Sequence, residues 1–183
     1  KRALDFNKTN WEELPATEKE GAAIAQLIKA KLLTKEEATS SAVKNNPKPK
    51  ILHIASHSFF LKDKDKNPLL RSGIVLAGAN NKFDNTIDNG YLTALEVSRL
   101  DWENTELVVI SGCESGLGSI KSGEGVYGLK RAIAVAGARS SLLSLWEVDD
   151  KATAEFMESF YKKIIKGVGR AEALSNVQSE FRN

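Results

Sequence analysis

The chain has 183 residues, of which 42% are hydrophobic, and this is enough for one domain with a sizeable core. Lysine and arginine total 26 against 24 acidic residues, so the net charge of +2 gives no bulk attraction to polyanions. We therefore expect no nucleic acid bound directly by this domain and no association with a membrane.

The cysteine usage and the first residue indicate the setting of the chain. Cys113 is the only cysteine, which excludes an internal disulfide and is typical of a reducing compartment. The chain also lacks an apolar run long enough to span a bilayer and a signal-peptide pattern at its start. We expect a cytoplasmic location. Residue 1 is Lys1 rather than methionine, which indicates a fragment of a longer protein.

The first fifty residues have helical patterns. Residues 21–33 carry apolar side chains at helical spacing, and two prolines within 45–50 should end any helix that precedes them. We expect residues 1–50 to form an N-terminal helical approach segment. Two helix starts are predicted from a threonine followed three residues later by a glutamate, at Thr17 with Glu20 and at Thr34 with Glu37.

From residue 51 onward, predicted strands and helices alternate. Apolar, β-branched runs predict strands at 51–58, 73–78, 106–112 and 140–146. Helices are predicted at 94–100 behind a Thr93–Glu96 capping box, at 123–138, at 151–167 and at 170–181. This alternation predicts an α/β fold with a mostly parallel central sheet and helices on both faces, in which 106–112 is a central strand.

A histidine and the lone cysteine each follow a predicted strand. His57 closes 51–58, and Cys113 follows 106–112. Because the carboxyl ends of parallel strands share one rim, we expect both side chains there, where a thiol nucleophile could meet its base. The alternative, in which Cys113 is a small buried residue and His57 a structural histidine, stays open.

Two other patterns are weaker. His53 and His57 form HxxxH, but on a strand they would lie roughly 13 Å apart at about 3.3 Å per residue, too far to share one metal ion. Gly123, Gly125 and Gly128 form GxGxxG, but they do not directly follow a strand as a dinucleotide site requires. We predict no metal and no cofactor.

Several segments together resemble a CHAT domain, the caspase-like and separase-like family that often follows tetratricopeptide repeats. These are ILHIASHSFF (51–60), GYLTALEV (90–97), LVVISGCESGLG (107–118) and GEGVYGLKRAIAVAGARSSLLSLWEVDDKAT (123–153), with WEELPATEKEGAAIAQLI (11–28) similar to the approach to such a domain. The resemblance implies a single caspase-like peptidase domain over 1–183 and a three-layer α-β-α sandwich.

The resemblance also implies a mechanism. Cys113 would attack a scissile peptide carbonyl as the thiolate, and His57 would hold that proton and pass it to the leaving amine, leaving a thioacyl-enzyme. The backbone N–H groups of Ser58 and Cys113 are the expected oxyanion donors. This chain has Ser58 where the family usually has glycine, and Gly112 where alanine is common.

The segment after the last predicted strand is expected to line the substrate cleft. Glu147, Asp149 and Asp150 could bind a basic P1 side chain, and Trp146 could form the floor of a hydrophobic subsite. Equally, Asp149 or Asp150 could cap the following helix, and Trp146 could be a core residue.

The expected partners follow from this assignment. They are a protein or peptide substrate and an upstream repeat domain or regulatory protein. Two other functions stay open: a catalytically silent caspase-like scaffold or interaction module, and acyl transfer to a small molecule through the same dyad.

Overall fold

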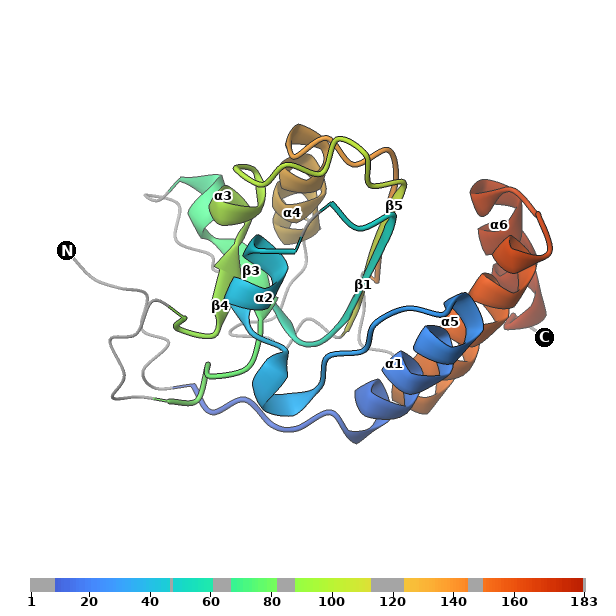
Figure 1. Cartoon of the computed structure of the whole chain (residues 1–183), viewed down its shortest axis with the longest axis horizontal. Helices are drawn as coiled ribbons and strands as arrows, with labels where there is room; N and C mark the ends of the chain where they lie inside the picture. The colour runs from blue at the N-terminus through green and yellow to red at the C-terminus, as the bar shows by residue number, and fades with distance from the viewer. Residues whose placement is uncertain are drawn as a thin grey trace. The chain divides into compact units, whose positions relative to one another are not determined.

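The computed structural model describes residues 9–46, 48–60, 67–81, 88–112, 124–144 and 150–182, without the side chains of residues 68, 124–126 and 150. The chain forms two compact units that share its length unevenly (Figure 1). The first unit comprises Lys1–Glu13 and Thr34–Glu147, and the second comprises Leu14–Leu33 and Val148–Asn183.

A three-stranded parallel sheet forms the centre of the first unit. Its order is β1 (Ile51–Ala55), β5 (Leu107–Ser111), β6 (Ser141–Leu143), with Ala55 paired to Ser111 at the carboxyl end. Every residue of β5 is buried, which accounts for its apolar character on both faces. The prediction of a central parallel strand at 106–112 is therefore confirmed.

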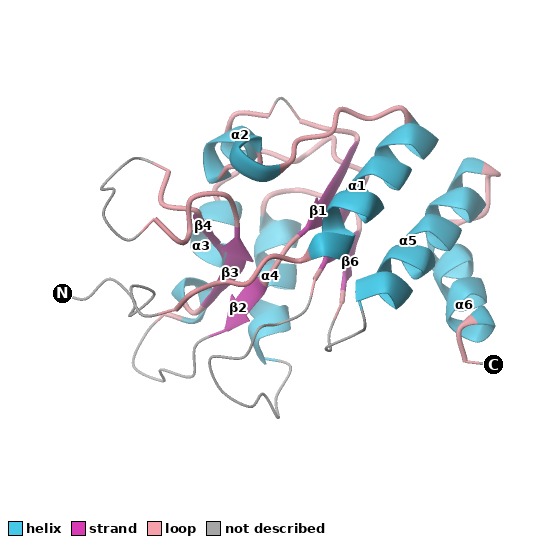
Figure 2. Ribbon diagram, turned by 90° about the horizontal axis from the view of Figure 1, so that it is seen from below, coloured by secondary structure: helices cyan, strands magenta, loops and turns pink. Residues whose placement is uncertain are grey.

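A second, antiparallel sheet has the order β2 (Ser58–Phe60), β3 (Ser72–Val75), β4 (Tyr91–Thr93) (Figure 2). The expectation of one mostly parallel sheet is correct for β1, β5 and β6 but wrong for residues 58–93. The predicted strand 51–58 divides between the two sheets. Residues 61–71, which join β2 to β3, are fewer than the dozen or more that a parallel crossover requires.

The helices of the first unit cover an apolar core. They are α2 (Ser40–Lys44), α3 (Ala94–Val97) and α4 (Glu124–Val135), with the 3₁₀ helices η2 (Lys35–Glu37) and η3 (Pro68–Leu70). Leu129 and Ile133 of α4 share one buried cluster with Val108 and Ile110 of β5. Because residues 108 and 110 alternate with 107 and 109 along the strand, this cluster marks one face of the parallel sheet.

The caps of these helices test the sequence patterns. At α3 both hydrogen bonds of the Thr93–Glu96 capping box are present, as predicted. The predicted box at Thr34 is wrong, because that threonine precedes only η2 and makes no side-chain cap. Thr39 caps α2 instead, accepting from the Ala42 N–H at 3.1 Å.

The second unit consists of α1 (Pro15–Ile28), α5 (Asp150–Ile165) and α6 (Arg170–Glu180), where α5 packs against both of the others (Figure 2). The helices expected at 151–167 and 170–181 are confirmed, whereas the helical pattern at 21–33 is a helix only as far as Ile28, and the Thr17–Glu20 capping box is wrong. Proline is favoured in the first turn, so α1 begins at Pro15 and Glu20 becomes a buried residue within it. None of the described helices is both long and apolar enough to cross a membrane.

Candidate functional site

His57 occupies the two-residue link between β1 and β2, where the chain passes from one sheet to the other. Ser56 ties this link to the parallel sheet, because its N–H donates to the Ser111 carbonyl at 3.0 Å, and its hydroxyl donates to the Val75 carbonyl. The His57 carbonyl in turn accepts from the Val75 N–H at 2.8 Å. The imidazole therefore projects from a corner whose backbone is fixed to both sheets.

The chain immediately before Cys113 lies against this corner. A Cβ atom added to Gly112 would meet the Ser56 carbonyl oxygen at 1.8 Å, closer than real Cβ contacts. This close approach of two backbones needs glycine at residue 112. The Ser144 hydroxyl accepts from the Gly112 N–H at 3.0 Å and donates to its carbonyl at 2.8 Å. The ends of β1, β5 and β6 are thus held together.

The two ring nitrogens of His57 have different surroundings. Nε2 lies 2.8 Å from the backbone carbonyl oxygen of Glu12, and a carbonyl can only accept, so Nε2 carries a proton and donates it. Nδ1 is buried and has no hydrogen-bond partner among the residues that the structure describes. In the neutral ring, Nδ1 is then the nitrogen with the free lone pair, which suits a base.

The segment that supplies the Glu12 carbonyl, residues 9–13, is called the N-terminal strap here. Its anchor is Trp11, which is 7% exposed and whose ring centroid lies 5.5 Å from that of His57. The Asn80 amide group clamps the Trp11 backbone, accepting from its N–H and donating to its carbonyl, each at 2.9 Å. Trp11 Nε1 donates to the Tyr91 hydroxyl at 2.9 Å. The strap therefore fixes the atom that orients the imidazole.

Burial of Tyr91 keeps this anchor in one protonation state. Burial raises the pKa of the Tyr91 hydroxyl, although the hydrogen bond from Trp11 acts in the opposite direction. The protonated hydroxyl can donate to the Ala79 carbonyl, 3.2 Å away, while it accepts from Trp11.

The backbone of Ser58 can be placed from the antiparallel ladder. Val75 N–H bonds to the His57 carbonyl, so residues 57 and 75 form a hydrogen-bonded pair. Ser58 and Ile74, the next pair in register, are therefore a non-hydrogen-bonded pair. The Ser58 N–H consequently points away from β3, toward the free edge of this sheet, and is not used in the β2–β3 ladder.

His53 lies on β1 and has a structural role. Its Nε2 is 3.1 Å from the hydroxyl oxygen of Ser111, a buried residue of the adjacent strand β5. His53 thus lies on a strand, as the sequence analysis expected. Among the described residues, no group of three histidine, cysteine or acidic side chains could hold a metal ion.

Most of the other predicted site residues lie outside the described residues: Cys113, Trp146, Glu147 and Asp149. Asp150 is the first residue of α5, but its side chain is not described. Their placement on the same rim as His57, and the roles of Cys113 as nucleophile and of the acids in binding substrate, stay predictions.

Four residues that the sequence analysis did not single out hold the described part of this site: Trp11, Glu12, Asn80 and Tyr91. One signal was available, because Trp11 is an isolated aromatic residue in the polar stretch 9–13. A large aromatic side chain in a polar stretch is often buried against an apolar surface elsewhere in the fold.

Comparison with known proteins gives a family match and two relatives. The CHAT domain model matches residues 1–183. Tetratricopeptide repeat protein 28 of Homo sapiens is 35% identical over 83 residues, which are 45% of this chain and 3% of that protein. The Mus musculus protein of the same name is 32% identical over 80 residues, which are 42% of this chain and 3% of that protein. The matched region is thus a small part of either relative.

Proposed function

Because this chain belongs to the CHAT domain family, which is caspase-like, we propose that it is a cysteine endopeptidase with a His57–Cys113 dyad. The observation that carries the proposal is the state of the His57 ring. Its Nε2–H is held by the Glu12 carbonyl, and its Nδ1 is buried without a partner among the described residues. An imidazole fixed in one tautomer with an unused lone pair is suited to accept a proton from a thiol.

Covalent geometry supports the pairing. Consecutive Cα atoms are about 3.8 Å apart, so Cys113 begins close to Gly112 whatever its own conformation. Gly112 in turn lies against Ser56, the residue before His57. Cys113 directly follows Gly112 and His57 directly follows Ser56, so the proposed nucleophile and base are the next residues after a backbone contact between Gly112 and Ser56.

The proposed reaction uses the two histidine nitrogens differently. Nδ1 takes the thiol proton, and the Cys113 thiolate attacks the scissile carbonyl carbon. The Glu12 carbonyl accepts from Nε2–H and so stabilises the imidazolium that forms. Nδ1–H then protonates the leaving amine, and the C–N bond breaks to leave a thioester. In the second half, Nδ1 takes a proton from water as that water attacks the thioester. The C–S bond then breaks, the peptide acid departs, and Nδ1–H returns its proton to the Cys113 thiolate.

The developing oxyanion needs donors placed before the reaction. We assign this role to the backbone N–H groups of Ser58 and Cys113. The support for Ser58 is that its N–H points away from the β2–β3 ladder, so the pairing of these strands does not use it. Loss of one such donor typically slows turnover by about 10² to 10³-fold.

The proposal extends to the fold, the substrate and the partners. We propose a caspase-like three-layer arrangement and a protein or peptide substrate with a basic P1 residue bound by Glu147, Asp149 or Asp150. Both relatives are named for tetratricopeptide repeats, which supports an upstream repeat domain or regulatory protein as the partner that controls this domain.

Labelling with an electrophilic peptide tests the dyad directly. Because Cys113 is the only cysteine, any thiol adduct on the chain reports that residue. A peptidyl acyloxymethyl ketone with arginine at P1 should label the wild type, and His57→Ala should reduce the rate at least about 100-fold, the size typical of a lost general base.

A matched control exists in the second histidine. His53→Gln removes the other imidazole and keeps a hydrogen-bonding group for Ser111, so it should be labelled at nearly the wild-type rate. If the wild type and His57→Ala were labelled equally, the dyad would be wrong. That result, with no cleavage of a peptide library, would favour the silent scaffold.

A further inference from the structure

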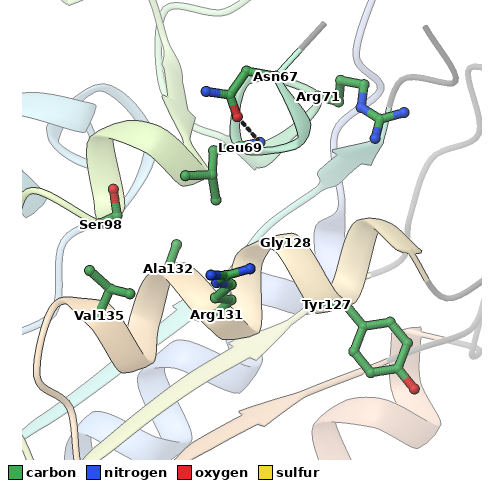
Figure 3. A pocket seen from close by; sticks show the side chains of 9 residues that line it. All are labelled: Asn67, Leu69, Arg71, Ser98, Tyr127, Gly128, Arg131, Ala132 and Val135. Atoms are coloured by element: carbon green, nitrogen blue, oxygen red, sulfur yellow. Dashed lines mark hydrogen bonds between the residues drawn. The ribbon is translucent and has the colours of Figure 1, made fainter. Parts of the chain in front are cut away.

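An open groove of about 600 Å³ lies in the first unit, between α4 on one side and η3 and the end of α3 on the other (Figure 3). We call it the α4 groove. Ala132, a member of the core cluster, and Leu69, which packs against that cluster, lie toward each other across it. The residues around them that matter for recognition are Arg71, Tyr127, Arg131 and Val135.

The outer rim of the groove is an apolar stripe interrupted by one charge. Tyr127, Arg131 and Val135 are four residues apart, so they lie on one face of α4. Tyr127 is 71% exposed and Val135 is 63% exposed. In the described part of the first unit, the only other exposed large hydrophobic residue is Leu70 of η3, at 36%. The exposed apolar surface of this unit is thus concentrated at the groove, as at interaction sites.

Among the described residues that line the groove, the charged ones are all of one sign. They are Arg71 and Arg131, and no acidic residue is among the lining residues that the structure describes. Neither guanidinium forms an ion pair with the described residues. Three lysines of the same unit differ in this respect, since each lies close to a carboxylate: Lys44 to Glu96, Lys48 to Asp101 and Lys50 to Glu106.

Arg71 also has an unused donor. Its guanidinium carbon lies 5.6 Å from the centroid of the Phe60 ring. Its Nε is buried and has no hydrogen-bond partner among the described residues. The guanidinium carries further N–H donors besides Nε, and a carboxylate is the partner that suits such a fork.

We propose that the α4 groove binds an acidic segment of a partner protein, an extended peptide in which carboxylate side chains flank an apolar one. The apolar side chain packs on Leu69 and Ala132, and the carboxylates bind Arg131 and Arg71. The stripe from Tyr127 to Val135 spans about 12 Å at 1.5 Å per helical residue. About four extended residues at 3.3 Å each match that length.

This site goes beyond the proposed peptidase activity. The groove residues include neither His57 nor the strap residues that hold it, so binding there requires no cleavage. The inference rests on charge complementarity together with the exposed apolar stripe, and a separate substitution on α4 tests each of these two features.

Fluorescence anisotropy with two labelled peptides tests the proposal. One peptide contains Glu-Leu-Phe-Asp in a glycine–serine frame, and the matched peptide contains Gln-Leu-Phe-Asn in the same frame. The whole chain, carrying Cys113→Ala so that nothing is cleaved, should bind the acidic peptide saturably. Because a charge-assisted contact contributes roughly a factor of ten or more, the neutral peptide should bind at least about tenfold more weakly.

Two neighbouring residues of α4 provide a matched pair of variants. Arg131→Glu reverses a charge inside the groove and should weaken binding of the acidic peptide at least about tenfold. Lys130→Glu makes the same charge change at the adjacent exposed position, outside the groove, and should have a much smaller effect. Tyr127→Ala should also weaken binding, and added salt should weaken it further.

Several outcomes would overturn the proposal. Equal weakening by Lys130→Glu and Arg131→Glu would show a general response to positive charge, and equal affinity for both peptides would show that carboxylates are not recognised. Absence of saturable binding would also overturn it, as would tighter binding of a thymidine oligonucleotide than of the acidic peptide. None of these results bears on the labelling of Cys113.

Discussion

Replacing Trp11 by alanine should free the His57 ring without unfolding the protein. A buried tryptophan covers about 150–250 Å², which at about 25 cal/mol per Å² is worth about 4–6 kcal/mol as an upper bound. The strap also makes four hydrogen bonds, two with Asn80 and one each with Tyr91 and His57. At about 1 kcal/mol each they add about 4 kcal/mol.

Against this stands the entropy of ordering the strap. Fixing the backbone of its five residues costs about 5–10 kcal/mol. The total gain of about 8–10 kcal/mol is of the same size, so loss of the indole leaves the strap undocked, because the hydrogen bonds alone do not offset that cost. The Glu12 carbonyl then leaves Nε2, and the imidazole can exchange between its two neutral tautomers.

Long-range ¹H–¹⁵N NMR of the imidazoles measures this change, and the chain has only two histidines to assign. At a pH where both rings are neutral, the wild type should show His57 as the Nε2–H tautomer alone, and Trp11→Ala should show both tautomers. Tyr91→Phe is the matched control, since it removes the hydrogen bonds of the hydroxyl with Trp11 and Ala79 and keeps the ring. A folded Trp11→Ala protein with an unchanged His57 tautomer would refute the reasoning.

Two further predictions concern the ends of strands and the Asp88 carboxylate. Ser144→Ala removes both hydrogen bonds to Gly112 and should lower the unfolding free energy by about 1–3 kcal/mol and slow labelling of Cys113. Ser140→Ala, which loses a bond to the Glu106 carbonyl at the other end of the sheet, should cost similar stability without slowing the labelling. Burial raises the pKa of Asp88, but hydrogen bonds from Ser40 and Ser41 outweigh it and hold that pKa well below its usual value. Because this pKa is lowered by folding, the Asp88 carboxylate stabilises the protein above about pH 4, and this stabilisation is lost as the pH falls through the folded pKa. Asp88→Asn should therefore lower the unfolding free energy, measured by urea titration, at neutral pH, and this effect should shrink in acid. If Asp88→Asn lowered the unfolding free energy equally at neutral and acidic pH, this assignment would be contradicted.

The helices and the central strand were predictable because burial imposes a period on the sequence. Strand β5 is apolar at its first four positions, 107–110, on both faces, and burial of the strand follows from that pattern. The Thr93–Glu96 box predicted a cap correctly, whereas Thr17–Glu20 did not, because Pro15 starts α1 two residues earlier. A capping pattern is therefore informative only where no stronger start signal precedes it.

The change of sheet at His57 was not predictable from local pattern. The run 51–58 is continuously compatible with one strand, and the corner arises from bonds of Ser56 and His57 to Val75, about twenty residues away. Strand β4 escaped notice because its three residues are too few to show alternation.

The orientation of His57 was also beyond sequence analysis. Every residue carries a carbonyl, so nothing in the side chain of Glu12 indicates that its main-chain oxygen holds an imidazole 45 positions away. Only the isolated Trp11 could have indicated that the strap docks on the first unit.

The division of the second unit between the two ends of the chain has a consequence for biosynthesis. Helix α1 ends at Ile28 and its partner α5 starts at Asp150, so 121 residues lie between them. At about 5–20 residues per second, α1 leaves the ribosome about 6–24 seconds before α5 exists. Throughout that interval the apolar side of α1, which includes Ile24, has no partner helix from its own unit to pack against. Assembly of the three-helix unit must therefore wait until α5 and α6 have been synthesised, and a ribosome that stalls before Asp150 leaves α1 without its partner helix.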